Sequence, residues 1–142
     1  MTFTIKHGLI IKAKPSIVYE AVSQAKHLNN WWTLESESKA VLGEDFRLYF
    51  GPEYDWLAVV QNANQANAFE VKMKRTMKDW EATSFGFKLE PKDENTQVSF
   101  YHRGWETDGY HFQNTSYCWA LLLKGLKDYV EKGIIIPFEK RA

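Results

Sequence analysis

The longest sustained pattern in the chain is helical. Between Tyr110 and Lys132, large apolar side chains recur at the spacing of one helix face, and Gly133 follows where a helix end favours positive φ. The pattern predicts one helix over 110–132, about 35 Å long at ~1.5 Å per residue. Its stripe runs through Phe112, Ser116, Trp119, Leu122, Leu123, Leu126 and Val130. Such a stripe needs a large apolar partner surface.

The part of the chain before this helix mostly alternates between apolar and polar residues, which predicts strands with one buried face. The alternation is clear over residues 3–11, 46–50, 69–75, 85–89 and 98–102. The run from Trp56 to Gln61 predicts a further strand, but its apolar residues do not show which face is inward. The polar stretch Asn62–Asn67 and the charged stretch Pro91–Asn95 predict connecting turns.

Two short helices are predicted between the first and second strands. Pro15 suits the first position of a helix that carries Val18, Ala21 and Val22, and residues 27–32 predict a second helical turn. Together the elements predict an α+β fold, in which a curved antiparallel sheet of about seven strands packs on one long C-terminal helix. The length of 142 residues predicts a single domain over 1–142.

Aromatic residues are abundant: the chain has nine Phe, seven Tyr and six Trp, which either fill a thick core or line a cavity. The formal net charge is zero, so we expect no nucleic-acid partner. The single cysteine, Cys118, excludes an internal disulfide. No stretch approaches the ~20 apolar residues of a membrane span, and the first residues lack a signal core. We therefore expect a cytoplasmic protein.

Four segments resemble motifs of one family in the same order. Residues 11–22 read IKAKPSIVYEAV, residues 28–32 read LNNWW, residues 96–105 read TQVSFYHRGW and residues 119–133 read WALLLKGLKDYVEKG. In order and spacing, these segments are similar to the activator-of-Hsp90-ATPase-like family of the START/SRPBCC superfamily, which has the helix-grip fold. The resemblance spans almost the whole chain.

The resemblance implies a cavity between the sheet and the long helix that holds a small hydrophobic molecule. Members of the superfamily bind lipids, sterols or polyketide-like compounds, and some catalyse cyclisation or hydrolysis. The family name comes from a co-chaperone, so contact with a chaperone is a second implied partnership. The name alone is weak evidence of function, because one fold hosts many functions.

The candidate ligand-binding residues lie at inward strand positions, on the second short helix and on the long helix. For each of them the alternative is an ordinary core residue. They are Trp31, Trp32, Phe50, Met73, Arg75, Phe85, Phe87, Phe100, His102, Phe112, Ser116, Trp119 and Leu123. We expect the cavity to open at the Phe112–Leu123 end of the helix, and the Leu126–Val130 end to pack as core.

Two of these residues can ionise. Arg75 can pair with a ligand carboxylate or phosphate, but it lies near a strand end and can instead be exposed at the rim. His102 can bind a ligand carbonyl or act as a general acid–base, and its alternative is a hydrogen-bonded core residue. The inward strand positions carry no paired carboxylates, and the four histidines and one cysteine lack metal-ligand spacing. We expect neither a metal nor a cofactor, and we read Asp108, or alternatively Asn114, as the cap of the long helix.

The leading hypothesis is a non-enzymatic protein that binds a small hydrophobic ligand. The first alternative is a co-chaperone-like interaction module, and the second is a cyclase or hydrolase that uses His102. The apolar tail Ile134–Phe138 either packs back on the sheet edge or forms a dimer contact, so we expect a monomer or a weak homodimer.

Overall fold

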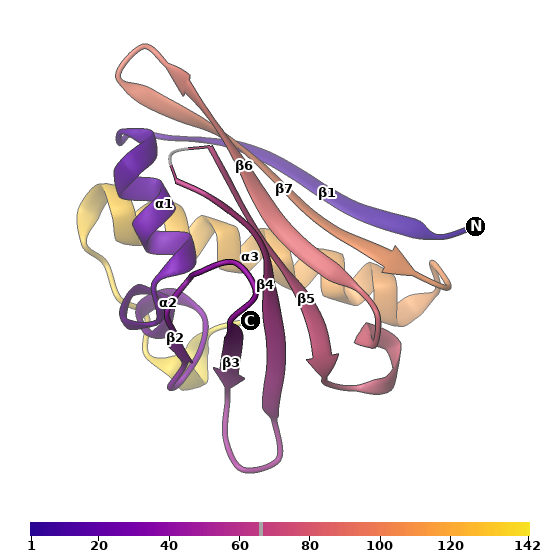
Figure 1. The fold of residues 1–142 in the computed structure, drawn as a ribbon. Helices are drawn as coiled ribbons and strands as arrows, with labels where there is room; N and C mark the ends of the chain where they lie inside the picture. The colour runs from indigo at the N-terminus through magenta and orange to yellow at the C-terminus, as the bar shows by residue number, and fades with distance from the viewer. Residues whose placement is uncertain (66) are drawn as a thin grey trace.

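One antiparallel sheet of seven strands forms the body of the molecule, with strand order β1-β7-β6-β5-β4-β3-β2 (Figure 1). The computed structural model describes residues 1–65 and 67–142. The elements are β1 (Phe3–Ile11), α1 (Pro15–Ser23), α2 (Ala25–Trp31), β2 (Glu37–Ser38), β3 (Asp45–Tyr49), β4 (Asp55–Asn64), β5 (Ala68–Arg75), the 3-10 helix η1 (Lys78–Trp80), β6 (Ser84–Lys92), β7 (Asn95–Trp105), α3 (Tyr110–Lys132) and the 3-10 helix η2 (Phe138–Lys140). This confirms the α+β helix-grip prediction.

The three α-helices pack against one face of the sheet, which we call the inner face. In Figure 1 the long helix α3 runs behind the strands, and α1 and α2 lie beside its C-terminal part. Contacts join α3 to β1, α1 to β5 and β6, and α2 to α3. The opposite face, which we call the outer face, carries the polar residues of the strand alternation. The period-two pattern therefore predicted correctly which face of the main strands packs on the helices, except at Arg75, whose side chain is exposed.

The long helix has the predicted bounds and the predicted C-terminal cap. Gly133 adopts φ 68°, and its N–H donates to the carbonyl of Tyr129 at 2.9 Å. The predicted N-cap is wrong. Gly109 occupies the cap position without a side-chain hydrogen bond, while Asp108 offers only its backbone carbonyl, to Gln113 Nε2 at 3.1 Å, and Asn114 lies inside the helix.

The two predicted turns are shorter than the polar stretches that suggested them. Strand β4 continues to Asn64, and position 66 of the expected turn lies outside the described residues. Strands β6 and β7 continue to Lys92 and Asn95, so Pro91 pairs with Thr96. Asp93 adopts φ 58°, and this left-handed conformation allows a tight two-residue connection where a longer loop was expected.

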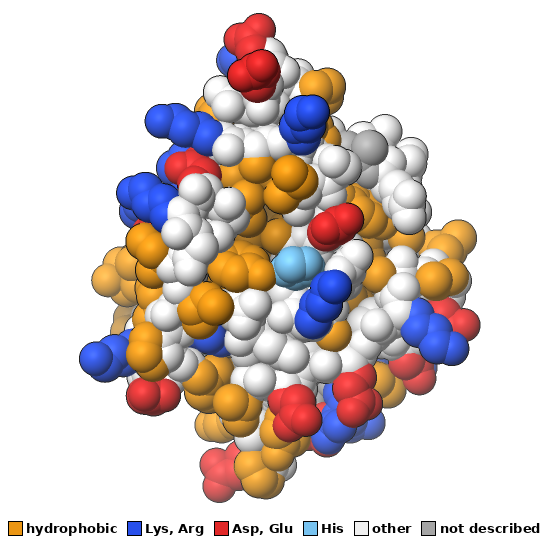
Figure 2. All heavy atoms as spheres, turned by 90° about the vertical axis from the view of Figure 1, so that its left-hand side faces the viewer, with side chains coloured by type: hydrophobic (Ala, Val, Ile, Leu, Met, Phe, Trp, Pro, Cys, Tyr) orange, Lys and Arg blue, Asp and Glu red, His pale blue; other side chains and the backbone are white. Residues whose placement is uncertain are grey.

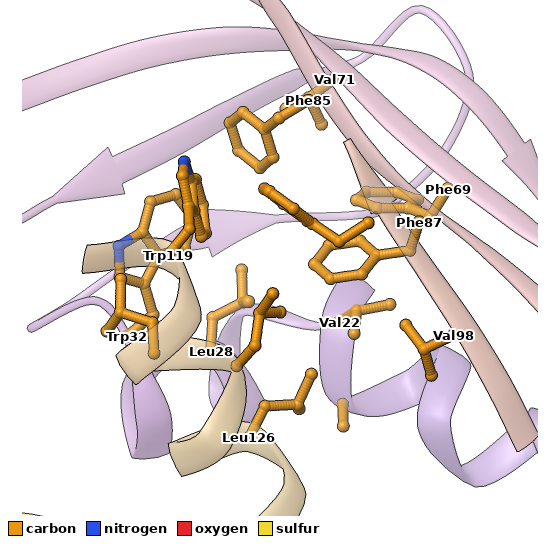
Figure 3. Close-up of a cluster of buried hydrophobic side chains, with 14 of the residues drawn as sticks. Val22, Leu28, Trp32, Phe69, Val71, Phe85, Phe87, Val98, Trp119 and Leu126 are labelled. Atoms are coloured by element: carbon orange, nitrogen blue, oxygen red, sulfur yellow. The ribbon is translucent and has the colours of Figure 1, made fainter. Parts of the chain in front are cut away.

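The core between the sheet and the helices is built largely from aromatic rings. Trp119 of α3 lies 4.5 Å from Phe100 and 4.9 Å from Trp32 between ring centroids, and Trp32 lies 5.4 Å from Phe85. Figure 3 shows side chains of the sheet and of the helices directed toward one another across this core. The numerous aromatic residues therefore fill a thick core.

The surface mixes charges of both signs. Figure 2 shows acidic and basic side chains interspersed, with hydrophobic side chains exposed between them, on the face turned to the left in Figure 1. This agrees with a formal net charge of zero. None of the helices in the described residues has the length and apolar composition needed to cross a membrane.

Candidate functional site

The core between the two short helices and the sheet is nearly full. The enclosed void there measures about 10 Å³ and is walled by core side chains that include Trp31, Trp32, Phe85 and Phe87. A single water molecule needs ~10–15 Å³ of such space. This void therefore has no room for an organic ligand.

A larger hollow of about 270 Å³ opens beside the N-terminal half of α3. It lies between this helix, the end of α2, the β3–β4 connection and η1. Its lining residues are Trp32, Phe50, Trp56, Met77, Trp80, His111, Asn114, Thr115, Cys118, Trp119, Leu122 and Ala142. The hollow borders the Phe112–Leu123 part of the helix, and the expected ligand cavity there stays a prediction.

Aromatic rings form most of the wall of this hollow. Phe50 lies 5.4 Å from Trp32 and 5.0 Å from Trp56 between ring centroids. Trp80 continues the wall, 5.0 Å from Trp56 and stacked on Trp119 at 6.2 Å. Rings packed against one another in this way hold a rigid apolar surface, because each has few torsions to reorganise.

Polar groups are few and stand at the margin of the hollow. His111 Nδ1 pairs with Asp79 Oδ2 at 2.7 Å. The half-buried Cys118 thiol lies 3.9 Å from Asn114 Oδ1. The Nε1 donor of Trp80 is buried and has no partner among the described residues. An apolar wall with a few polar groups is typical of small-molecule sites.

The helix presents a different face to this hollow than the stripe predicted. Phe112 packs instead on Phe3 and Trp105, with ring centroids 6.4 and 5.4 Å away. Ser116 Oγ lies 3.2 Å from His7 Nε2 of β1. These two residues face β1, and the adjacent face of α3, with Thr115 and Cys118, lines the hollow.

His102 is fully buried, and both of its ring nitrogens are hydrogen-bonded. Trp119 Nε1 donates to His102 Nδ1 at 3.2 Å, so Nε2 carries the proton and donates to Thr83 Oγ1 at 2.9 Å. Thr83 Oγ1 in turn donates to the Trp80 carbonyl at 2.7 Å. Burial, with a smaller effect from His111, lowers the pKa of His102 to about 3, so the ring is neutral at physiological pH.

This arrangement matches the core alternative for His102. Both nitrogens are already engaged, and the ring lies 4.5 Å from Trp80 and 5.1 Å from Trp105 between centroids. A general acid–base must reach a substrate proton with a free nitrogen. The geometry therefore favours a structural role that fixes Trp119 and the segment before β6.

The remaining predicted ligand residues separate into three groups. Trp32, Phe50 and Trp119 line the hollow. The side chains of Trp31, Met73, Phe85, Phe87, Phe100 and Leu123 are buried in the core. Arg75 points to neither: its side chain is 59% exposed, and it donates to the Asp55 carbonyl at 3.1 Å. Of the two readings of Arg75, the structure matches the exposed guanidinium and not the residue that pairs with a ligand in the cavity.

Sequence reasoning missed Trp56 and Trp80, which are two of the five rings of the aromatic wall. The strand of Trp56 reads as an unbroken apolar run, and a bulge between Leu57 and Ala58 shifts its register. Trp80 lies in the short helix η1, where no period exists to assign a face. The sequence feature that could have identified Trp80 is the presence of a single tryptophan in the otherwise charged segment Lys78–Glu81.

No group of three or more His, Cys, Asp or Glu side chains in the described residues is placed to hold a metal ion. Besides its rings, the hollow is lined by the polar residues Asn114 and Thr115, by the Cys118 thiol and by His111, which pairs with Asp79. Such a set can bind an apolar molecule by contact.

Comparisons with known proteins agree with the fold. A family model described as activator of Hsp90 ATPase homolog 1-like protein matches residues 12–131. The Aha1 dimer from Colwellia psychrerythraea, solved in solution, is 26% identical, with a TM-score of 0.83 over 92% of this chain and 98% of that chain. Protein SSP2350 from Staphylococcus saprophyticus is 17% identical, with a TM-score of 0.82 over 99% and 98% of the two chains, and this likeness shows the fold alone. No match is found among curated proteins.

Proposed function

This chain belongs to the activator of Hsp90 ATPase homolog 1-like family, and we propose that it is a non-enzymatic protein that binds a small hydrophobic molecule. The observation that carries the proposal is the hollow of about 270 Å³ walled by Trp32, Phe50, Trp56, Trp80 and Trp119. The contact of exposed ring surface with water is unfavourable, and a planar apolar ligand would remove that contact.

The size of the hollow restricts the ligand class. Ligand pockets usually measure ~300–1,000 Å³, so a volume of about 270 Å³ is at the small end. The enclosed void between the two short helices and the sheet adds only about 10 Å³. We therefore propose a compact aromatic compound, since a sterol or a long acyl chain would require the packed core to open.

Binding would be moderate in strength. Apolar contact contributes about 25 cal/mol per Å² of buried ligand area, and association costs offset several kcal/mol of the total. A ligand this small would then have a dissociation constant between about 1 μM and 1 mM.

Intrinsic fluorescence provides a direct test, because four of the six tryptophans line the hollow. The purified protein would be titrated with a flavonoid, a long-chain fatty acid and a sterol. We expect a saturable change with the flavonoid and none with the other two. Mass spectrometry under denaturing conditions would also reveal a small molecule that co-purifies.

A variant that fills the hollow makes the test specific. Cys118→Phe places a ring into the hollow from a half-buried position, and we expect it to abolish the flavonoid response. Leu121→Phe adds similar bulk at an exposed position of the same helix and should leave the response unchanged. Equal effects of the two variants, or no response to any of the compounds, would refute the proposal.

A second candidate is a protein-interaction module, as the family description suggests. The observation in its favour is an exposed apolar strip on α3, where Tyr110 is 81% and Tyr117 64% exposed. The 26% identical relative from Colwellia psychrerythraea is described as a dimer. Light scattering during gel filtration would test self-association, and a pull-down with purified Hsp90 would test chaperone contact. A monomeric protein that recovers no Hsp90 would remove this candidate.

A cyclase or hydrolase is the weakest candidate. It would depend on His102, whose two nitrogens are bound to Trp119 and Thr83 within the core. A proton transfer through this ring would require both hydrogen bonds to break and the aromatic packing to open.

A further inference from the structure

A second hollow, of about 920 Å³, lies on the outer face of the sheet, opposite the helices. Its centre follows one row of cross-strand neighbours, in which Lys6 of β1 pairs with Tyr101 of β7, Tyr101 with Gly86 of β6, and Gly86 with Glu70 of β5. The neighbouring row contains Gly8, Ser99 and Lys88. Because Gly8, Gly86 and Ser99 have small side chains or none, the centre of this face forms a depression between longer side chains.

Gly86 is required at the floor of this outer hollow. A Cβ atom there would lie 2.6 Å from the Phe69 carbonyl and 2.8 Å from the hydroxyl oxygen of Tyr101. The Tyr101 ring therefore lies across Gly86 and reaches the next strand. Its hydroxyl donates to a carboxylate oxygen of Glu70.

Glu70 is an almost fully buried carboxylate on a face that is otherwise open to water. Its side chain is 7% exposed, and it accepts hydrogen bonds from Gln61 Nε2, from the Tyr101 hydroxyl and from Arg103 Nη2, the last at 2.7 Å. Burial and the bond to Glu70 raise the pKa of Tyr101, so its hydroxyl stays protonated. Arg103 neutralises the Glu70 charge, and the floor is a rigid, satisfied network.

The charge that remains around this floor is positive. Lys6 and Lys88 line the outer hollow and form no ion pair with any of the described residues. Arg103 is 53% exposed, and only its Nη2 is engaged by Glu70. Three cations and one carboxylate thus line the outer hollow of a protein whose formal net charge is zero.

The spacing of the three cations is set by the sheet. With strands ~4.8 Å apart and ~3.4 Å per residue, the Cα atoms of Lys6 and Arg103 lie about 8 Å apart, and those of Lys6 and Lys88 about 12 Å apart. Lysine side chains are flexible, whereas Arg103 is fixed by Glu70. The cations can therefore surround a molecule with two or more separated anionic groups.

We propose that this outer hollow binds a small organic polyanion that carries phosphate or carboxylate groups. Lys6 and Lys88 neutralise its charges, Arg103 donates through its free nitrogens, and the small residues at the floor admit the molecule. The site is separated from the aromatic hollow by the full thickness of the sheet and core. It is therefore independent of the proposed hydrophobic ligand.

The test is a titration of ¹⁵N-labelled protein with pyrophosphate and, separately, with citrate, followed by amide chemical shifts. We expect saturable shifts at Lys6, Gly8, Ser99 and Tyr101, and none along the α3 residues that line the aromatic hollow. The probe with the tighter binding identifies phosphate or carboxylate as the preferred group. Absence of saturable shifts on the outer face with both probes at about 10 mM would overturn the proposal.

Matched double variants separate a site from a general charge effect. The double variant with Lys6→Gln and Lys88→Gln lacks two lysines of the outer hollow, and we expect it to bind at least about tenfold more weakly. The control double variant with Lys26→Gln and Lys39→Gln lacks two exposed lysines elsewhere, and its affinity should change less than about twofold. Equal weakening in both double variants would show non-specific attraction and would also overturn the proposal.

Discussion

The buried ring of His102 predicts a specific dependence of stability on pH. Burial lowers its pKa from 6.5 to about 3 in the folded protein, so the folded state binds this proton less tightly than the unfolded state does. The contribution of neutral His102 is fully present above pH 6.5. It is lost progressively as the pH falls from 6.5 toward 3, because the unfolded state takes up the proton first.

The magnitude follows from proton linkage. One proton bound only by the unfolded state changes the free energy of unfolding by about 1.4 kcal/mol per pH unit. Between pH 6.5 and about pH 5, the protein should therefore lose about 2 kcal/mol of stability. This interval avoids the carboxylates of Asp55 and Asp128, whose lowered pKa values place their losses at more acidic pH.

Urea unfolding followed by tryptophan fluorescence at several pH values would measure this slope. His102→Gln should lower stability at neutral pH, because it disturbs the bonds to Trp119 and Thr83, and should flatten the slope in this interval. His7→Gln, at a partly buried strand position, should retain it. A wild-type stability that is level over this interval, or an equal slope in His102→Gln, would refute the reasoning.

Three further changes test the packing by urea unfolding. Gly86→Ala should destabilise the protein by about 2 kcal/mol or more, because its Cβ would lie 2.6 Å from the Phe69 carbonyl; an unchanged midpoint would contradict the close approach. Gly125→Ala meets no atom within 4 Å inside α3 and should stabilise by about 0.5–1 kcal/mol, so a loss would show an unseen constraint. Leu126→Ala, at a fully buried position, should cost about 2–5 kcal/mol yet leave the flavonoid response intact; a lost response in folded protein would place the ligand elsewhere.

The candidate site was only partly predictable. Trp32, Phe50 and Trp119 were identified because each lies on an element with a clear period or beside one. Trp56 and Trp80 were missed because a bulge and a three-residue helix carry no usable period. Glu70 lies on the polar side of its strand's alternation, and that pattern does not show that Gln61, Tyr101 and Arg103 cover it on the outer face.

The helix face that lines the hollow shows the same limit. The apolar stripe predicted correctly that Trp119, Leu123 and Leu126 are buried. It did not show that Phe112 and Ser116 turn toward β1 while Thr115 and Cys118 border open space. The stripe shows which helix residues are apolar. The direction in which the helix crosses the sheet decides which residues each side of that stripe contacts.

The sequence by itself determined the order and type of the elements, the bounds of α3 and the inner and outer faces of the main strands. These follow from periodicity and from local terminators such as Pro15 and Gly133, whose effects act within a few residues. Only the tertiary structure decided that the rings fill the interior, that His102 is locked between Trp119 and Thr83, and that three cations line one hollow with Glu70. Those outcomes depend on the volumes and charges that strands far apart in sequence bring together, which no local pattern records.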